Sequence, residues 1–423
     1  MHSNMTTRRL FLQKGMTLVA ASATVPTFLD QTVLAVANPQ DVHNTQQPTG
    51  KDGKILVVVQ MSGGNDGLSM LVPFADDTYH RLRPVIGHDA STVHKLNDYV
   101  GLHPSLGPVA DMIQAGKAAV IQGVGYPNPN RSHFRSMDIW QSASREDQIE
   151  STGWLGRFFD NACPGCDPQV GISIGQTLPL AMQGEKVMPL AFERPEAFRY
   201  NGPDHDRYEK LNKLRSTGAS SNSHKVSPSG ELDFLHRTAM DAQLSSEKIL
   251  DIVRKYQSAS QYPAGEFGQG LRTIAAMIRG GLPTRVYYVS LTGFDTHAGQ
   301  RQRHDNLMKQ FAQGMSAFWK DMENQKNDER VLMMTFSEFG RRVAQNASGG
   351  TDHGTAAPMF VFGSRVKSGV VGKHPSLTDL DQGDLRFTTD FRSVYATVLQ
   401  TWLDAPVKPI LGGDFKTLPI VRA

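Results

Sequence analysis

Cysteine is almost absent from this chain, which has two, Cys163 and Cys166, in 423 residues. Thiolates therefore cannot supply a ligand set, and any metal would be held by carboxylates and imidazoles. The Cys-Pro-Gly-Cys motif can close a tight local disulfide in an oxidising compartment. A redox centre is the alternative, because this spacing lowers the pKa of a thiolate. The motif follows an expected helix at 154–161 instead of opening one, so we favour a structural role.

An excess of charge of either sign is also missing. The chain has 44 basic and 41 acidic residues and a formal net charge of +3. The first 37 residues carry most of this excess, so the remainder is close to neutral. A nucleic-acid-binding protein gathers positive charge on one face or helix. We therefore expect no nucleic-acid partner.

Long hydrophobic runs are missing beyond residue 37, so we expect no membrane span in the mature protein. Residues 7–15 read TRRLFLQKG, a twin-arginine signature, and an apolar stretch and the small-residue site Ala35-Val36-Ala37 follow. We interpret residues 1–37 as a signal peptide for the twin-arginine translocase. Residues 38–53 are polar and predict a disordered mature N-terminus. The predicted location is periplasmic or secreted.

Apolar runs with the length of buried strands alternate with helical patterns along the rest of the chain. The runs are 55–60, 118–122, 286–291, 331–336 and 359–362, and the helical patterns are 102–115, 154–160, 231–257, 270–279, 307–322 and 391–403. This alternation predicts an α/β fold, a doubly wound and mainly parallel sheet flanked by helices, in one domain over 54–423. Residues 165–232, which hold short β-like pieces and a Ser/Gly-rich stretch, are expected to form a lid or insertion.

Polar side chains follow the first two runs at the point where each ends. Asp66 lies in Ser-Gly-Gly-Asn-Asp-Gly after the first run, where a plain Asx-turn is the alternative to a ligand role. Arg131, Ser132 and His133 follow the second run. Ser132 suits a nucleophile and equally suits a helix N-cap.

The later runs end in the same way. Asp295 and His297 follow the third run, with a helix-entry turn as the alternative interpretation, and Glu338, Arg341 and the pair Asp352-His353 follow the fourth. Because the carboxyl ends of parallel strands share one edge, these side chains are expected to form one site. Carboxylates and imidazoles suit one or two divalent ions, Zn²⁺, Mn²⁺, Fe or Mg²⁺. Ser132 would attack an anionic phosphate or sulfate ester while arginines such as Arg131 and Arg341 neutralise its oxygens.

Six motifs together resemble the bacterial domain-of-unknown-function 1501 family over nearly the whole mature chain. They are the segments 62–67, 131–134, 294–297, 337–341, 350–354 and 389–395. That family is placed in the alkaline-phosphatase-like superfamily, which includes sulfatases, and the resemblance implies that fold with a two-metal site.

The resemblance also implies roles for single residues. Asp66 matches the first-strand metal ligand, Ser132 the nucleophile, and Asp352 with His353 the Asp-His ligand pair. Asp295 and His297 match another ligand segment, with a spacing of two where the superfamily has four. His374 is a possible late ligand. The leading prediction is an exported metal-dependent ester hydrolase, and the alternative is a non-catalytic binding or assembly protein on the same fold.

Overall fold

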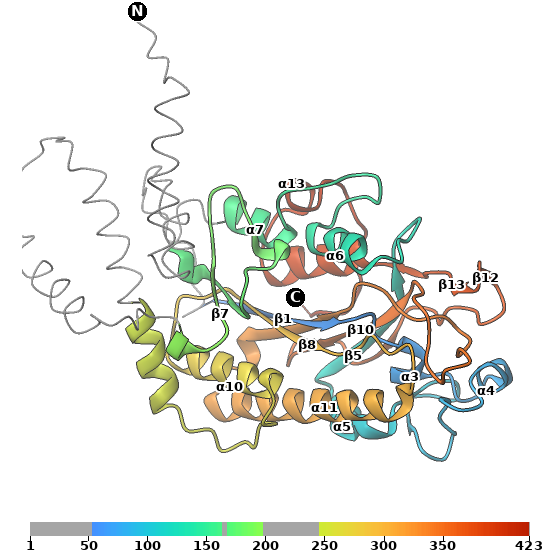
Figure 1. Cartoon of the computed structure of the whole chain (residues 1–423). Helices are drawn as coiled ribbons and strands as arrows, with labels where there is room; N and C mark the ends of the chain where they lie inside the picture. The colour runs from blue at the N-terminus through green and yellow to red at the C-terminus, as the bar shows by residue number, and fades with distance from the viewer. Residues whose placement is uncertain (1–52, 163–166, 198–244, 423) are drawn as a thin grey trace, which may run out of the picture.

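A nine-stranded sheet runs through the centre of the computed structural model, which describes residues 53–162, 167–197 and 245–422 (Figure 1). The strand order is β11-β5-β10-β9-β1-β8-β6-β7, and β14 pairs with β5. Only β10 runs antiparallel to its neighbours among the described strands of this sheet. The strands are β1 (Ile55–Ser62), β5 (Ala118–Gly125), β6 (Gly171–Ile174), β7 (Leu190–Phe192), β8 (Val286–Thr292), β9 (Val331–Phe336), β10 (Ala357–Phe362), β11 (Gly369–Val371) and β14 (Thr389–Asp390).

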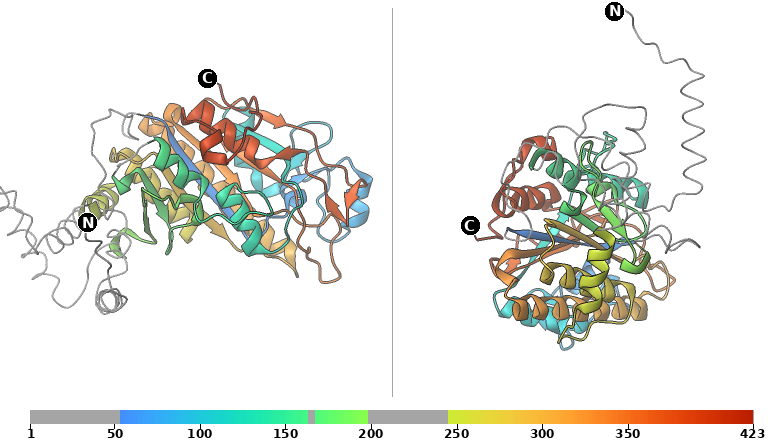
Figure 2. Two further views of the ribbon diagram at one scale, coloured as in Figure 1. Left: turned by 90° about the horizontal axis from the view of Figure 1, so that it is seen from above. Right: turned by 90° about the vertical axis from the view of Figure 1, so that its left-hand side faces the viewer.

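Helices cover both faces of the sheet, as the two views of Figure 2 also show. One layer holds α5 (Gly107–Gln114), α10 (Glu266–Arg279) and α11 (Gln300–Gln325). The other holds α6 (His133–Ser142), α7 (Trp154–Ala162), α12 (Phe391–Thr397), the π-helix η6 (Val398–Trp402) and α13 (Lys408–Leu411). The predicted doubly wound α/β fold is confirmed.

Alternation along β1 explains why this strand lies at the centre. Val57 and Val59 pack into the core of the first helix layer, whereas Leu56 and Val58 pack into that of the second. A strand buried on both faces reads as an unbroken apolar run, which is the pattern of 55–59. Its partners β8 and β9 lie on either side and run parallel to it.

The remaining elements are short. A three-stranded sheet contains β2 (Leu71–Val72), β4 (Gly101–Leu102) and β3 (His94–Lys95), and β12 (Leu380–Asp381) pairs with β13 (Asp384–Leu385). Short helices are α3 (Gly67–Met70), α4 (Asp77–Leu82), η1 (Pro104–Leu106), η2 (Pro168–Val170), η3 (Leu180–Met182), η4 (Pro195–Ala197) and η5 (Asp328–Arg330).

Several expectations fall on the borders of the described ranges. Residues 167–197, assigned from the sequence to a lid or insertion, contribute β6 and β7 to the end of the sheet. The helix expected over 231–257 is described from residue 245 and ends at 255. The leader, Cys163 and Cys166, and residues 198–244 lie outside the described residues. No helix in the described part of the chain is long and apolar enough to cross a membrane.

Candidate metal centre

Three histidines and one aspartate converge at the shared edge of β5, β8 and β9. The Oδ1 atom of Asp295 lies 3.0 Å from Nε2 of His297, 3.4 Å from Nε2 of His353 and 3.6 Å from Nε2 of His133. The Nε2 atoms of His297 and His353 are themselves 3.0 Å apart. Ligand atoms of His133, Asp295 and His353, from three distant parts of the sequence, all lie within 4.8 Å of one another, and His297 approaches the group through Asp295 and His353.

The other ring nitrogen of each histidine is held by an oxygen acceptor. The Nδ1 partners are Glu338 Oε1 for His133 at 2.8 Å, Asp352 Oδ1 for His297 at 3.3 Å, and the Arg131 carbonyl for His353 at 2.8 Å. An oxygen that can only accept places the proton on Nδ1 and leaves the lone pair on Nε2.

This arrangement fits a bound cation. Three nitrogen lone pairs and a carboxylate oxygen repel one another, and the Arg341 guanidinium offsets this repulsion from one side only, at 2.7 Å from Oδ1 of Asp295 and 3.5 Å from Nε2 of His297. Nδ1 held by carboxylate or carbonyl is the usual support of a metal-binding histidine. Nε2 of His133 is also buried without a hydrogen-bond partner among the described residues. The set of three imidazoles and one carboxylate suits Zn²⁺, Fe or Mn²⁺ better than Mg²⁺, which prefers oxygen ligands.

Arg341 holds the loops of the site together from behind. Its side chain is buried and donates to the carbonyls of Gly63, Gly64, Phe294 and Thr351 and, at 2.7 Å, to Oδ1 of Asp295. Burial alone would raise the pKa of the Asp295 carboxyl, but the guanidinium outweighs it and lowers that pKa. The carboxylate of Asp295 is therefore ionised and oriented. The guanidinium of Arg341 directs its hydrogen bonds to acceptors within the protein.

Two glycines allow the loops to come this close. Gly63 has φ of 118°, and a Cβ there would overlap the backbone of Asp295. The N–H of Gly63 donates to Oε1 of Glu338 at 2.9 Å, the same oxygen that accepts from His133. A Cβ on Gly350 would overlap the backbone of His297. Both positions therefore require glycine for the site to close.

Of the three residues after β5 that the sequence predicts to be catalytic, His133 is part of this centre, and Ser132 and Arg131 lie beside it. Ser132 is the N-cap residue of α6 and is exposed, and its hydroxyl makes no capping hydrogen bond. The Arg131 guanidinium turns away and pairs with Asp384, while its carbonyl supports His353. Asp352 is exposed and serves as the Nδ1 acceptor of His297. Hydrogen bonding from Asn346 lowers the pKa of Asp352.

Asp66 lies apart from these histidines. Oδ2 of its carboxylate is 2.6 Å from the Arg83 guanidinium, and both side chains are fully buried. Ser69 and Gln300 also donate to that oxygen. Although burial opposes ionisation, Arg83 lowers the pKa of Asp66. Asp66 therefore lies in a buried ion pair with Arg83.

His374, the possible late ligand, also has protein partners. Its ring bonds the carbonyl of Pro375 and contacts the ring of Tyr99.

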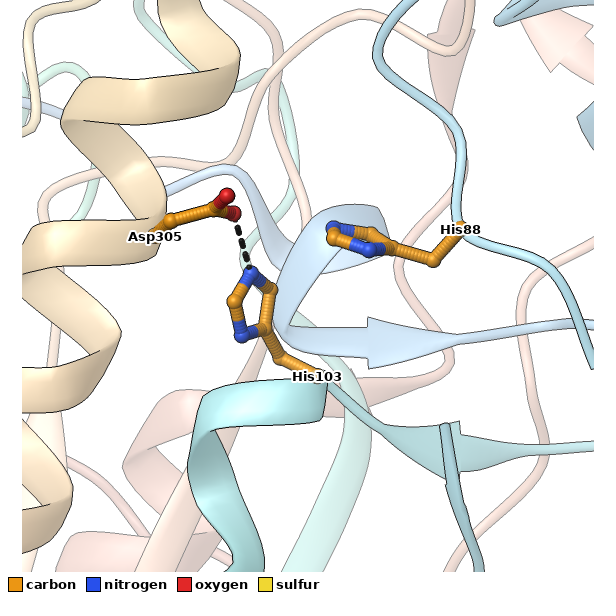
Figure 3. Close-up of side chains that lie close together, drawn as sticks. All are labelled: His88, His103 and Asp305. Carbon is orange, nitrogen blue, oxygen red and sulfur yellow. Dashed lines mark hydrogen bonds and ion pairs between the residues drawn. The ribbon is translucent and has the colours of Figure 1, made fainter. Parts of the chain in front are cut away.

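A second cluster, His88, His103 and Asp305, also has the composition of a metal site (Figure 3). Its hydrogen bonding differs, because Nδ1 of His103 accepts the N–H of Ser105 at 3.0 Å. The proton must then lie on Nε2, which donates to Asp305 at 2.8 Å. Burial also lowers the pKa of His103 to about 2, so the ring is neutral. Neither nitrogen of His103 has a free lone pair, so this cluster is a hydrogen-bonded staple between η1 and α11.

The sequence did not indicate how two groups support the candidate metal centre. Glu338 was expected at the shared site without a stated role, and the structure shows it orienting His133. The carbonyl of Arg131 is a backbone group that no sequence pattern marks. The described part of the chain thus places one convergent centre, with His133, Asp295, His297 and His353 facing it.

A family model described as a protein of unknown function (DUF1501) matches residues 53–403. The chain belongs to this family. A comparison with curated proteins finds no match.

Solved structures similar to this family member have low identity. The PsFucS1 sulfatase from Pseudoalteromonas sp. is 9% identical, with 88% of this chain and 74% of that chain covered and a TM-score of 0.38. The zinc complex of the C-terminal periplasmic domain of EcEptC from Escherichia coli is 8% identical, with 74% of each chain covered and a TM-score of 0.36. A protein in the alkaline phosphatase superfamily from Vibrio parahaemolyticus is 9% identical, with 81% and 70% covered and a TM-score of 0.31.

Proposed function

We propose that this protein is an exported, metal-dependent hydrolase of phosphate or sulfate esters. The observation that supports it is the convergence of three Nε2 lone pairs on Oδ1 of Asp295, with every Nδ1 proton held by an oxygen. Export rests on the twin-arginine signature of residues 7–15. An ester of a multiply charged acid is the substrate class because a cation next to a serine stabilises charge spread over several oxygens.

In this proposal His133, Asp295, His297 and His353 hold one divalent ion. When bound, the ion supplies the positive charge that attracts the anionic ester and offsets the charge that develops during attack. Glu338, Asp352 and the Arg131 carbonyl keep the imidazoles oriented, and Arg341 keeps Asp295 in place.

Ser132 is the proposed nucleophile. Its hydroxyl is exposed and makes no hydrogen bond to the N–H groups of α6, so it is free to react. Its position at a helix N-terminus favours an anion, because the first backbone N–H groups point outward there. Its Oγ would form the bond to phosphorus or sulfur as the bond to the alcohol of the ester breaks, and the hydroxyl proton would pass to the departing alkoxide. Water would then hydrolyse the phosphoryl or sulfuryl serine, which releases the inorganic ion and restores the hydroxyl.

A second candidate function is a non-catalytic binding or assembly protein with one structural metal. It is favoured by the placement of the two arginines expected to bind the ester, because Arg131 pairs with Asp384 and Arg341 is saturated by protein acceptors. Metal would be retained in such a protein without turnover at Ser132.

Elemental analysis of the mature protein, purified without chelator, tests the metal site. We expect about one equivalent of zinc, iron or manganese, which His353→Ala should lose. His80→Ala is the control and should keep the metal, because His80 lies in α4 and bonds the Phe74 carbonyl. Hydrolysis of 4-nitrophenyl phosphate and 4-nitrophenyl sulfate then separates the two candidates. Absence of metal from the wild-type protein contradicts the metal site, whereas metal without hydrolysis of either ester supports the binding protein.

A further inference from the structure

A cavity of about 750 Å³ opens at the carboxyl ends of β1, β6 and β8, and no residue of the candidate metal centre lines it. The turn 175–180 and the start of α10 form its other walls. Its size is that of a pocket for a small molecule or for part of a larger one. Thr292 lines the cavity, and Asp295 of the metal centre follows three residues later in the same loop.

The floor of the cavity is a fixed network of neutral side chains. Gln141 of α6 accepts the N–H of Ala181 at 3.3 Å, so its Nε2 faces Gln60 and Tyr288 and donates to Gln60 Oε1 at 3.2 Å. The Tyr288 hydroxyl donates to the same Oε1. Both lone pairs of that oxygen are therefore used, which fixes the orientation of the Gln60 amide.

Three polar groups in this floor are left without partners among the described residues. They are Nε2 of Gln60 and the hydroxyls of Ser173 and Ser290, all of which line the cavity. Gln60 is 7% exposed and Ser173 is 2% exposed, so solvent reaches them only through the cavity. Gln60 and Ser290 are paired in register across β1 and β8. Adjacent strands lie about 4.8 Å apart, so these groups are spaced to contact one small ring.

The charges of the cavity indicate what kind of ring it suits. Its charged residues are Glu193, Arg194 and Glu266, and Arg194 and Glu266 are exposed at the rim. A second phosphate or sulfate would be repelled by two carboxylates with a single arginine to offset them. Apolar side chains such as Ile174, Leu178 and Val289 also line the cavity, and they suit the C–H faces of a ring. A lipid tail would leave the amides and hydroxyls of the floor without hydrogen-bond partners. Hydroxyl groups of the ligand, which both donate and accept, match the unpartnered amide and serines.

We propose that this cavity binds the neutral, polyhydroxylated part of the ester substrate, a sugar residue. This inference rests on the proposed function for the ester group alone. His133 and Gln141 are eight residues apart on α6, which places the cavity floor about 12 Å along the helix from the metal centre. The sugar bound in the cavity is therefore a neighbour of the one that carries the ester, and the substrate is a saccharide of more than one residue.

Direct binding of neutral sugars tests the proposal without any hydrolysis. Saturation-transfer NMR would be run on the full mature protein with glucose, galactose, mannose, fucose and N-acetylglucosamine. We expect transfer to at least one of them. Gln60→Met keeps the shape of the side chain and removes the amide, and it should weaken binding of that sugar roughly tenfold. Ser290→Ala should weaken the same binding about fivefold. Gln313→Met, on the exposed face of α11, is the matched control and should bind as the wild type does.

Each result decides the proposal separately from the metal chemistry. Transfer that survives in His353→Ala but falls in Gln60→Met supports the sugar site even if no ester is hydrolysed. No transfer to any of the five sugars, or transfer unchanged in both Gln60→Met and Ser290→Ala, overturns it. If Gln60→Met does not fold, Ser290→Ala alone gives the answer, because its side chain makes no protein hydrogen bond among the described residues.

Discussion

The Nε2 atoms of His297 and His353 face each other at 3.0 Å, and the Nδ1 atom of each ring has an oxygen partner. Two imidazoles that carry a proton on Nδ1 and none on Nε2 cannot hydrogen-bond to each other through Nε2. In the proposed function, a cation bound by both rings would resolve this contact. This pair distinguishes the site from the His88–His103–Asp305 cluster, where Nε2 of His103 keeps its proton.

Glu338→Gln should weaken metal binding without unfolding the protein. The amide keeps the size of the carboxylate but lacks the negative charge that makes the His133 imidazole a stronger ligand. We expect metal affinity to fall at least roughly tenfold, measured by competition with a chromophoric chelator. Glu329→Gln, an exposed glutamate near Arg365, is the matched control. Equal affinity in both variants would show that Glu338 does not support a metal ligand.

Asp66→Asn should destabilise the fold and leave the metal in place. Removing one charge of a buried pair leaves Arg83 uncompensated, which costs about 3 to 5 kcal/mol of unfolding free energy. Urea denaturation measures this loss, and metal analysis of the folded fraction measures occupancy. Asp98→Asn, an exposed aspartate, serves as control. A stable Asp66→Asn protein that has lost its metal would return Asp66 to the ligand set.

Ser132→Ala should abolish ester hydrolysis, with unchanged metal content and stability. The hydroxyl makes no capping bond, so its removal leaves the helix end as it was and takes away only the nucleophile. Steady-state hydrolysis of a 4-nitrophenyl ester, with Ser91→Ala as an exposed control, is the measurement. Undiminished turnover in Ser132→Ala would exclude this serine as the nucleophile.

Stability should fall as the pH drops below about 6.5, because of buried histidines behind the site. Burial lowers the pKa of His304 to about 4, below the ordinary value of the unfolded chain. Between about pH 6.5 and 4 the unfolded state therefore binds a proton that the folded state does not. Each such histidine removes up to about 1.4 kcal/mol of unfolding free energy per pH unit in that window.

His304→Gln isolates this contribution. Burial lowers the pKa of His88 to about 3 as well, so the variant keeps part of the slope that the wild type shows. Urea denaturation at several pH values should give a slope smaller by up to one proton in His304→Gln. Unfolding free energies that stay constant from pH 7 to about pH 5 would mean that these rings are not held neutral.

The central strands were predictable because burial on both faces leaves an unbroken apolar run, as in 55–59 and 331–336. The direction of β10 was not, because an apolar run of six residues is the same in a parallel and an antiparallel pair. The strands β6 and β7 are three or four residues long and separated by prolines, which makes them look like a loop region.

The site was predictable as far as side chains follow strand ends. His133, Asp295, His297 and His353 do, and they converge. Asp66 also follows a strand, but it forms a buried ion pair with Arg83, which lies seventeen residues later in the sequence. No local sequence pattern marks this pair. The role of Asp352 depends on the direction in which its side chain leaves the loop. Hydrogen bonds with Asn346 and His297 determine this direction.

His133 follows β5 and Asp295 follows β8, yet β10, β9 and β1 lie between these two strands in the sheet. An ion held by both side chains would link opposite halves of the sheet across its central strands. Pulling the halves apart would then require release of the ion, so removal of metal should accelerate unfolding more than it slows folding. The proposed centre would act as a cross-link between the two halves of the sheet, and its occupancy by metal would set the lifetime of the folded state.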